Sequence, residues 1–82
     1  MRLSELKRRQ PAIVEAVEDT VANDPIARRL RELGFVAGED VEMLATGPVG
    51  AEPLLVQIGF TRFALRRSEA ARVRLRVNGE QG

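Results

Sequence analysis

The side chains of this sequence that could do chemistry are its hydroxyls, its carboxylates and its arginines. The 82 residues contain no histidine and no cysteine. A histidine general base, a thiolate nucleophile and a cysteine metal site are therefore excluded. Without a histidine base, no group of the usual kind can activate the hydroxyls of Ser4 and Ser68. Each serine is instead expected to cap one short helical turn. We predict no catalytic residue.

Two pairs of adjacent carboxylates, Glu18-Asp19 and Glu39-Asp40, are the next candidates. Neighbouring side chains in extended chain point to opposite faces, so neither pair forms a catalytic dyad by itself. No spacing typical of a Mg²⁺ or Ca²⁺ loop is present, although a site built from carboxylates alone is the alternative. No glycine-rich loop followed by Lys and Ser or Thr could hold a nucleotide phosphate. We expect both pairs to lie at turns, and we predict no metal site and no cofactor.

The arginines are unevenly distributed. Residues 53–77 carry six arginines and one acid, a local charge of +5 in a chain whose net charge is +1. Arg72, Arg74 and Arg76 would share one face of an alternating strand. Such a face could contact phosphates or an acidic protein surface. The interpretation that we favour is a solvated strand face whose arginines pair across the sheet with Glu15, Glu18 or Glu42.

Exposed apolar residues suggest a protein-binding edge. The chain has only three phenylalanines and no tyrosine or tryptophan, and two of the three are expected in the core, so nucleic-acid binding by base stacking is disfavoured. Phe60 is the exception, because it lies in an expected tight turn and should be exposed. Pro48 and Val49 should be exposed in the loop 47–53. We expect these apolar tips on one rim of the fold.

One helix and five short strands must position these residues. The helix signal covers residues 24–35, where Asp24 is a good N-cap and Pro25 suits the first helical position. Gly34 can adopt the left-handed conformation that ends the helix, and Phe35 can then pack back on it. The apolar stripe of this helix has the spacing i, i+4 and i+7, from Ile26, Leu30 and Leu33.

The strand pattern predicts a mainly β (α+β) fold. Strands are expected over 12–18, 40–46, 54–58, 62–66 and 72–77, followed by a polar tail over 78–82. With the helix between the first and second strands, a small curled barrel would remove most exposed strand edges. We predict one domain over 1–82. The apolar runs are far shorter than the roughly 20 residues that span a bilayer, and no signal peptide is visible, so we expect a soluble cytoplasmic protein without membrane insertion.

Three segments, taken in order, resemble the FeoA family, the small accessory proteins of bacterial ferrous iron transport. They are Leu3-Ser4-Glu5-Leu6, the helix-to-turn segment 24–38 that contains Leu33-Gly34-Phe35, and the segment 62–70 that contains Leu65-Arg66-Arg67-Ser68-Glu69-Ala70. The resemblance implies an SH3-like β-barrel with the helix inserted after the first strand. It also implies a partner, the cytosolic GTP-binding region of the membrane permease FeoB. Weak self-association is a further expectation.

On this resemblance we predict a non-enzymatic adaptor whose partner-binding residues are Pro48, Val49, Phe60, Arg62, Arg66 and Arg67. The alternative is a regulatory domain of the metal-dependent repressor type, which would bind protein or nucleic acid through its arginine-rich strand face. Two departures from the family pattern concern the shape of the rim. Arg8-Arg9 stands where members often have Pro-Gly, so the turn must form without glycine's conformational freedom. The loop 47–53 is about one residue longer than is common.

Overall fold

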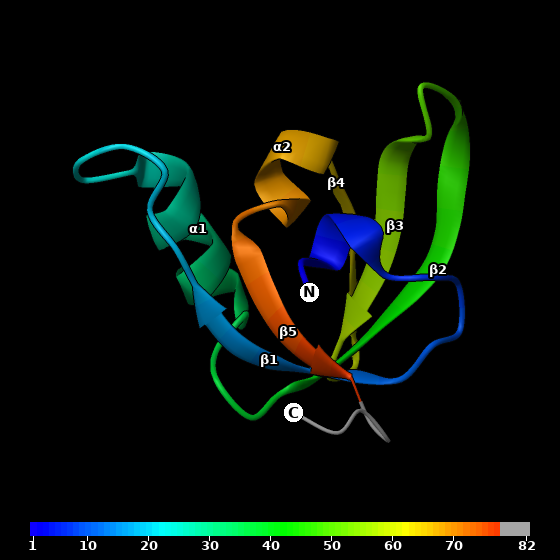
Figure 1. Ribbon diagram of the computed structural model, residues 1–82, viewed down its shortest axis with the longest axis horizontal. Coiled ribbons are helices and arrows are strands. Elements are labelled where there is room, and N and C mark those ends of the chain that lie inside the picture. The colour runs from blue at the N-terminus through cyan, green and yellow to red at the C-terminus, as the bar shows by residue number, and fades with distance from the viewer. Residues whose placement is uncertain (78–82) are drawn as a thin grey trace.

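Five antiparallel strands, one helix of nine residues and two short helical turns form the fold of residues 1–77, which the computed structural model describes (Figure 1). The expected tail over 78–82 lies outside these residues. In chain order the elements are η1 (Leu3–Glu5), β1 (Ala12–Val17), α1 (Pro25–Leu33), β2 (Asp40–Val49), β3 (Glu52–Ile58), β4 (Thr61–Leu65), α2 (Arg67–Ala70) and β5 (Val73–Val77).

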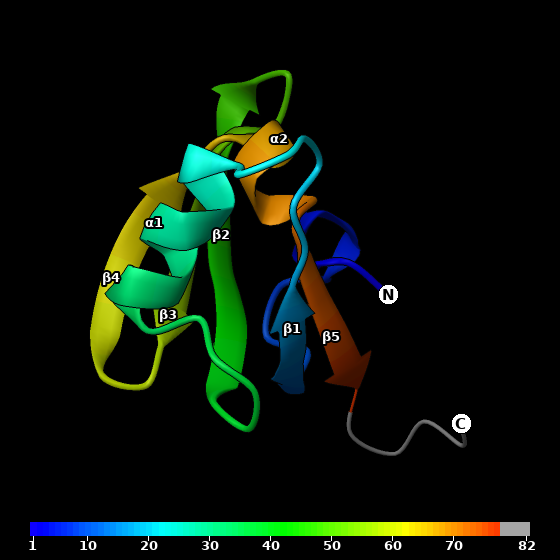
Figure 2. The same cartoon turned by 90° about the vertical axis from the view of Figure 1, so that its left-hand side faces the viewer.

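The strands form one sheet in the order β4-β3-β2-β1-β5, in which every neighbouring pair is antiparallel. The sheet is strongly curled, and α1 lies over its open side between β4 and β1 (Figure 2). The predicted mainly β fold, with the helix between the first and second strands, is confirmed. Within the described residues no helix is both long and apolar enough to span a bilayer.

The core lies inside the curl, where alternate strand residues point inward. Val73, Leu75 and Val77 of β5 are buried, and the residues between them are not. Phe35 is fully buried, and its ring centroid lies 5.9 Å from that of Phe63. Burial of apolar surface is the main force that holds such a small domain together.

Helix α1 begins and ends as the sequence predicts. The Asp24 carboxylate accepts hydrogen bonds from the backbone N–H groups of Ile26 and Ala27, and Pro25 occupies the first turn. Gly34 is left-handed with φ 116°, and the N–H of Phe35 donates to the carbonyl of Leu30 at 3.0 Å. These caps satisfy helix-end groups that would otherwise lack partners.

Three local predictions are wrong. Most of the predicted loop 47–53 is strand, because β2 continues to Val49 and β3 begins at Glu52. The pairing of β2 with β3 shifts register between Thr46 and Val49, so the two strands stay paired through this segment rich in glycine and proline. Its composition alone would place the segment in a loop. Neither Ser4 nor Ser68 caps a helical turn.

Glutamates in the first turn take the place of the two serines. Glu5 Oε1 accepts the N–H of Arg2 at 2.7 Å, and Glu69 Oε1 accepts the N–H of Arg66 at 2.8 Å. Each serine therefore lies inside its turn, one position after the first residue. The carboxylates, three residues after the residue that they contact, fill the capping role.

The turn before β1 forms without glycine, as the departure from the family pattern implies. Arg9 has φ 65°, in the left-handed region, and its N–H donates to the carbonyl of Met43 at 3.0 Å. A side chain in this conformation is strained, whereas glycine adopts it without a Cβ penalty. We expect Arg9→Gly to raise the free energy of unfolding by about 0.5–1 kcal/mol in urea denaturation, after the greater freedom of glycine in the unfolded chain is offset.

The matched control for this prediction is Arg8→Gly, because φ of Arg8 is not positive. It removes a neighbouring arginine and introduces the same residue, but it relieves no strain. We expect it to leave the stability unchanged or to lower it. An Arg9→Gly protein no more stable than the Arg8→Gly protein would contradict the prediction.

Candidate partner-binding surfaces

The six residues predicted to bind a partner are all exposed. The Phe60 side chain protrudes completely, and that of Val49 is 80% exposed. Pro48, Arg62, Arg66 and Arg67 are also exposed. No ion pair involves these three arginines among the described residues. Their charges are therefore available to another molecule.

The structure divides these six residues between two ends of the sheet. Pro48 and Val49 lie at the tip of the β2–β3 hairpin, whereas Phe60 lies in the β3–β4 turn. Two hairpins that share one strand have their turns at opposite ends of that strand. The seven residues of β3 separate the turns by about 20 Å at 3.3 Å per residue. The expected single rim is therefore wrong.

We call the first group the hairpin end (Pro48, Val49, Arg66 and Arg67) and the second the turn end (Phe60 and Arg62). At the hairpin end, the N–H of Arg67 donates to Glu52 Oε2 at 2.7 Å, which ties the start of α2 to the start of β3. At the turn end, Arg62 Nε donates to Gln57 Oε1 at 3.1 Å. A role for either end in partner binding stays a prediction.

Arg74 of the arginine-rich strand face is neutralised within the chain, whereas Arg76 forms no ion pair among the described residues. Arg74 forms ion pairs with Glu15 and Glu18, two of the three partners expected for this face. Glu18 also pairs with Arg2, and this hydrogen bond, together with the charges of both arginines, lowers the pKa of the Glu18 carboxyl. The alternative of a phosphate-binding face therefore loses support.

Arg72 does not lie on that face at all. It precedes β5, and its side chain turns inward to the carboxylate of Asp24, with Nε 2.7 Å from Oδ2. Asp24 is almost completely buried, and the Arg72 side chain is only 11% exposed. The carboxylate also accepts hydrogen bonds from the backbone and hydroxyl of Thr20. The N-cap of α1 therefore joins three segments, a contact that the strand pattern did not predict.

This environment makes the stability of the protein sensitive to acid. Hydrogen bonds from the Thr20 N–H and from Arg72 hold the pKa of the Asp24 carboxyl far below its ordinary value of 3.8. Because the folded-state pKa is lowered, the stabilisation is present above pH 3.8 and is lost as the pH falls below it. We expect the free energy of unfolding to fall steadily with acidification in this range, and more shallowly for Asp24→Asn. Equal slopes in urea denaturation series at several pH values would contradict this.

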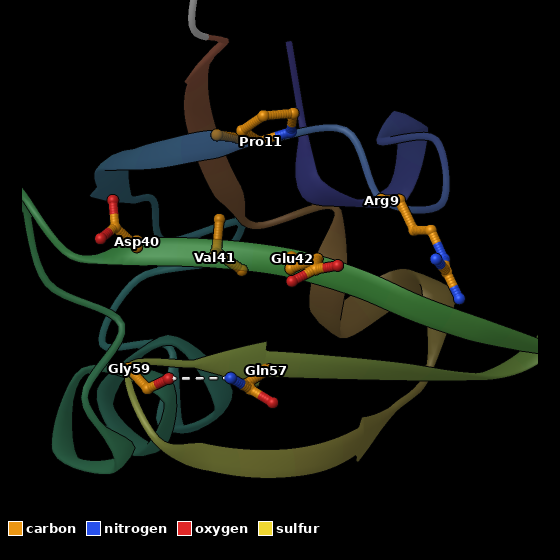
Figure 3. A pocket seen from close by; sticks show the side chains of 8 residues that line it. Arg9, Pro11, Asp40, Val41, Glu42, Gln57 and Gly59 are labelled. Atoms are coloured by element: carbon orange, nitrogen blue, oxygen red, sulfur yellow. Dashed lines mark hydrogen bonds between the residues drawn. The ribbon is translucent and has the colours of Figure 1, made fainter.

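A shallow pocket of about 220 Å³ lies beside the start of β2 (Figure 3). Asp40 and Glu42 lie along β2, between Pro11 on one side and Gln57 and Gly59 on the other. The amide of Gln57 donates to the carbonyl of Gly59 at 3.2 Å. Within residues 1–77, no group of three or more side chains of the kinds that bind metals lies close together. The pocket thus holds scattered carboxylates and no assembled centre.

A second groove, of about 350 Å³, separates α1 from β4. The sequence places its apolar residues in the core, and Ile26, Leu33 and Phe63 do pack against the core, but they are only partly buried and their exposed parts line the groove. Leu30 and Leu65 form its deeper part. The predicted apolar stripe of the helix supplies Ile26, Leu30 and Leu33 to this groove.

Comparison with known proteins identifies the relatives of this chain. The model of the FeoA domain family matches residues 1–77. One similar protein is FeoA from Stenotrophomonas maltophilia, whose crystal structure with zinc is described as an SH3 domain protein and a candidate ferrous iron transport activating factor. Its sequence is 68% identical to this chain, and its structure aligns with a TM-score of 0.86. The match covers 93% of this chain and 89% of that one. The solution structure of Chlorobium tepidum FeoA is 34% identical with a TM-score of 0.81, covering 100% and 75%.

A more distant similarity concerns the fold alone. The manganese regulator SloR is 9% identical with a TM-score of 0.71, covering 95% of this chain and 34% of that one. No curated protein sequence matches the chain. The SH3-like fold predicted from the resemblance is confirmed, because the matching FeoA structures cover nearly the whole chain. With the family match over residues 1–77, these similarities show that the chain belongs to the FeoA family of ferrous iron transport proteins.

Proposed function

We propose that this protein is a cytoplasmic, non-enzymatic adaptor that regulates ferrous iron uptake by binding the cytosolic GTP-binding region of an FeoB-type permease. The observation that carries the proposal is membership of the FeoA family over residues 1–77, with a 68% identical relative described as a candidate transport activating factor. A protein without histidine or cysteine has few means of catalysis. An exposed surface is then its principal means of action.

Two features of that surface support a protein partner. Exposed large apolar side chains at the end of a fold often mark an interaction site, and Phe60 and Val49 are the most exposed of those described. Arginines that form no ion pair among the described residues lie beside both, and arginine is enriched in protein interfaces. Each end thus has an apolar side chain of the kind found at the centre of an interface and a charged side chain of the kind found at its polar rim.

The test uses the purified chain and the purified cytosolic domain of FeoB from the same organism. Calorimetry measures binding, and GTP hydrolysis is measured with and without the chain. We expect saturable binding. Phe60→Ser or Val49→Ser should weaken it about tenfold or more, according to which of the two side chains fills a pocket of the partner. Val21→Ser is the matched control, because Val21 is also an exposed valine but lies in the loop before α1.

The salt dependence of binding separates this proposal from the nucleic-acid alternative. Contacts with phosphates weaken steeply as salt rises, whereas burial of apolar side chains does not. Absence of both binding and any change in GTP hydrolysis would overturn the proposal. Binding that the Val21→Ser control weakens as much as the Phe60→Ser and Val49→Ser variants do would overturn the assignment of the two ends.

A further inference from the structure

The two edge strands of the sheet differ in how they are covered. At the β5 edge, the N–H of Leu75 donates to the carbonyl of Met1 at 2.7 Å, and Arg2 forms a bridge with Arg74. The N-terminus therefore covers that edge. At the other edge, β4 pairs only with β3 among residues 1–77. An uncovered edge strand presents a row of backbone groups that can pair with another chain.

The hairpin geometry shows which backbone groups of β4 point outward. Gly59 and Phe60 form a two-residue turn that pairs Ile58 with Thr61. The pair that closes such a turn is hydrogen-bonded, and hydrogen-bonded and non-hydrogen-bonded pairs alternate along an antiparallel ladder. The backbones of Thr61, Phe63 and Leu65 therefore bond to β3. The N–H and C=O of Arg62 and Ala64 therefore point outward from this edge of the sheet. Helix α1 lies beside β4, across the open side of the sheet (Figure 2).

The groove between α1 and β4 runs directly along this edge. Phe63, Ala64 and Leu65 line one wall, and Ile26 and Leu33 on α1 line the other. A strand that paired with β4 would point every second side chain into this apolar space. Backbone pairing and side-chain pockets would then act together, as in other cases of strand addition.

The charges around the groove favour an acidic occupant. Arg29 lines the groove, and Arg66 follows Leu65 at the end of β4. Neither forms an ion pair among the described residues. The one acid in the lining, Glu69, already accepts the N–H of Arg66 at 2.8 Å. Glu69 keeps its negative charge, so Arg29, Arg66 and Glu69 together leave a net charge of +1 around the groove.

We propose that the β4 edge binds an extended acidic segment of a partner protein, which adds to the sheet as a sixth strand. Its alternate apolar side chains occupy the groove between α1 and β4, and its carboxylates contact Arg29 and Arg66. This inference rests on the proposed function in that the partner is a protein. It names a surface that shares Arg66 with the hairpin end and Arg62 with the turn end but does not include the exposed tips at Val49 and Phe60.

The direct test uses fluorescein-labelled nine-residue peptides in which Val or Leu alternates with Glu or Asp, and a matched set with Lys at the acidic positions. Binding to the full chain is measured by fluorescence anisotropy, and its location by amide chemical shifts. We expect the acidic set to bind more tightly than the basic set, with the largest shifts at Arg62, Ala64 and the groove residues. Dilution of the chain without peptide shows whether a second copy occupies the edge instead.

Two variants separate the contributions of charge and backbone. Arg29→Glu should weaken acidic-peptide binding about fivefold, whereas Arg28→Glu, the neighbouring exposed arginine outside the groove lining, should not. Ala64→Pro should weaken binding about tenfold, because it removes an outward N–H while an edge strand tolerates proline. If Ala64→Pro does not fold, the Arg29 and Arg28 pair decides the question.

The same variants tested against the FeoB cytosolic domain distinguish the two proposals. If the domain binds the chain and Arg29→Glu has no more effect than Arg28→Glu, the adaptor function stands and the β4 site is overturned. If the acidic peptides bind at β4 but the domain does not bind, the site stands and the adaptor proposal falls. Peptide shifts away from β4, equal binding of acidic and basic peptides, or shifts at β4 on dilution would each overturn the site.

Discussion

Replacing Asp24 with alanine is expected to lower the melting temperature of this protein by about 10 °C or more. Loss of an N-cap alone shifts a domain of this size by several degrees, roughly 4–8 °C. Here the same carboxylate also accepts bonds from Thr20 and pairs with Arg72. The variant would leave the largely buried Arg72 guanidinium without its carboxylate, with only the Ser68 carbonyl still bonded to it, and a buried charge without its counter-charge is costly.

Circular dichroism at 222 nm during heating measures this effect, with Asp19→Ala as the matched control. Asp19 also pairs with an arginine, Arg31, but about 40% or more of each side chain is exposed. Exposed pairs of this kind contribute little to stability. A loss for Asp24→Ala no greater than that for Asp19→Ala would show that the buried carboxylate does not hold these segments together.

Gly47→Ala is expected to destabilise the protein by about 1–3 kcal/mol, the usual cost of an overpacked site. A Cβ at this position would lie 2.0 Å from the carbonyl oxygen and 2.4 Å from the carbonyl carbon of Glu52, and 2.7 Å from Cδ of Pro53. Two of these are backbone atoms of the facing strand, which cannot turn aside as a flexible side chain can. The β2–β3 hairpin would have to open.

Pro48→Ala is the control for this variant, because Pro48 is the exposed neighbour of Gly47. Urea denaturation gives the free energy of unfolding, and amide shifts show whether the change is confined to the hairpin. A Gly47→Ala protein as stable as the Pro48→Ala protein, with unchanged shifts for Leu54 and Leu55, would contradict the close approach of the two strands.

Local signals in the sequence were sufficient where the structure depends on neighbouring residues. Asp24, Pro25 and Gly34 determine the ends of α1 through contacts within a few residues, so the helix could be read from its caps. Alternation predicted the buried face of β5 for the same reason. The prediction of Ser4 and Ser68 as caps was wrong because each turn begins earlier than the serine suggests, with Arg2 and Arg66 as the N-cap residues.

The candidate surfaces depended on contacts that no local pattern contains. The exposure of Phe60 and Val49 could be predicted from turn residues, but not that they lie at opposite ends of β3. The pairing of Arg72 with Asp24 joins residues 48 positions apart. The groove beside β4 exists only because α1 packs across the open side of a curled sheet.

The sequence by itself determined that this chain is small and mainly β with one helix, because caps, turns and alternation act between residues a few positions apart. Its resemblance to the FeoA family rested on the order of three motifs, and the family match over residues 1–77 showed the membership. Only the tertiary structure decided which arginines are neutralised, which apolar residues line a groove, and which strand edge is left open. Those properties follow from how distant segments pack, and each depends on the position of every strand in the sheet.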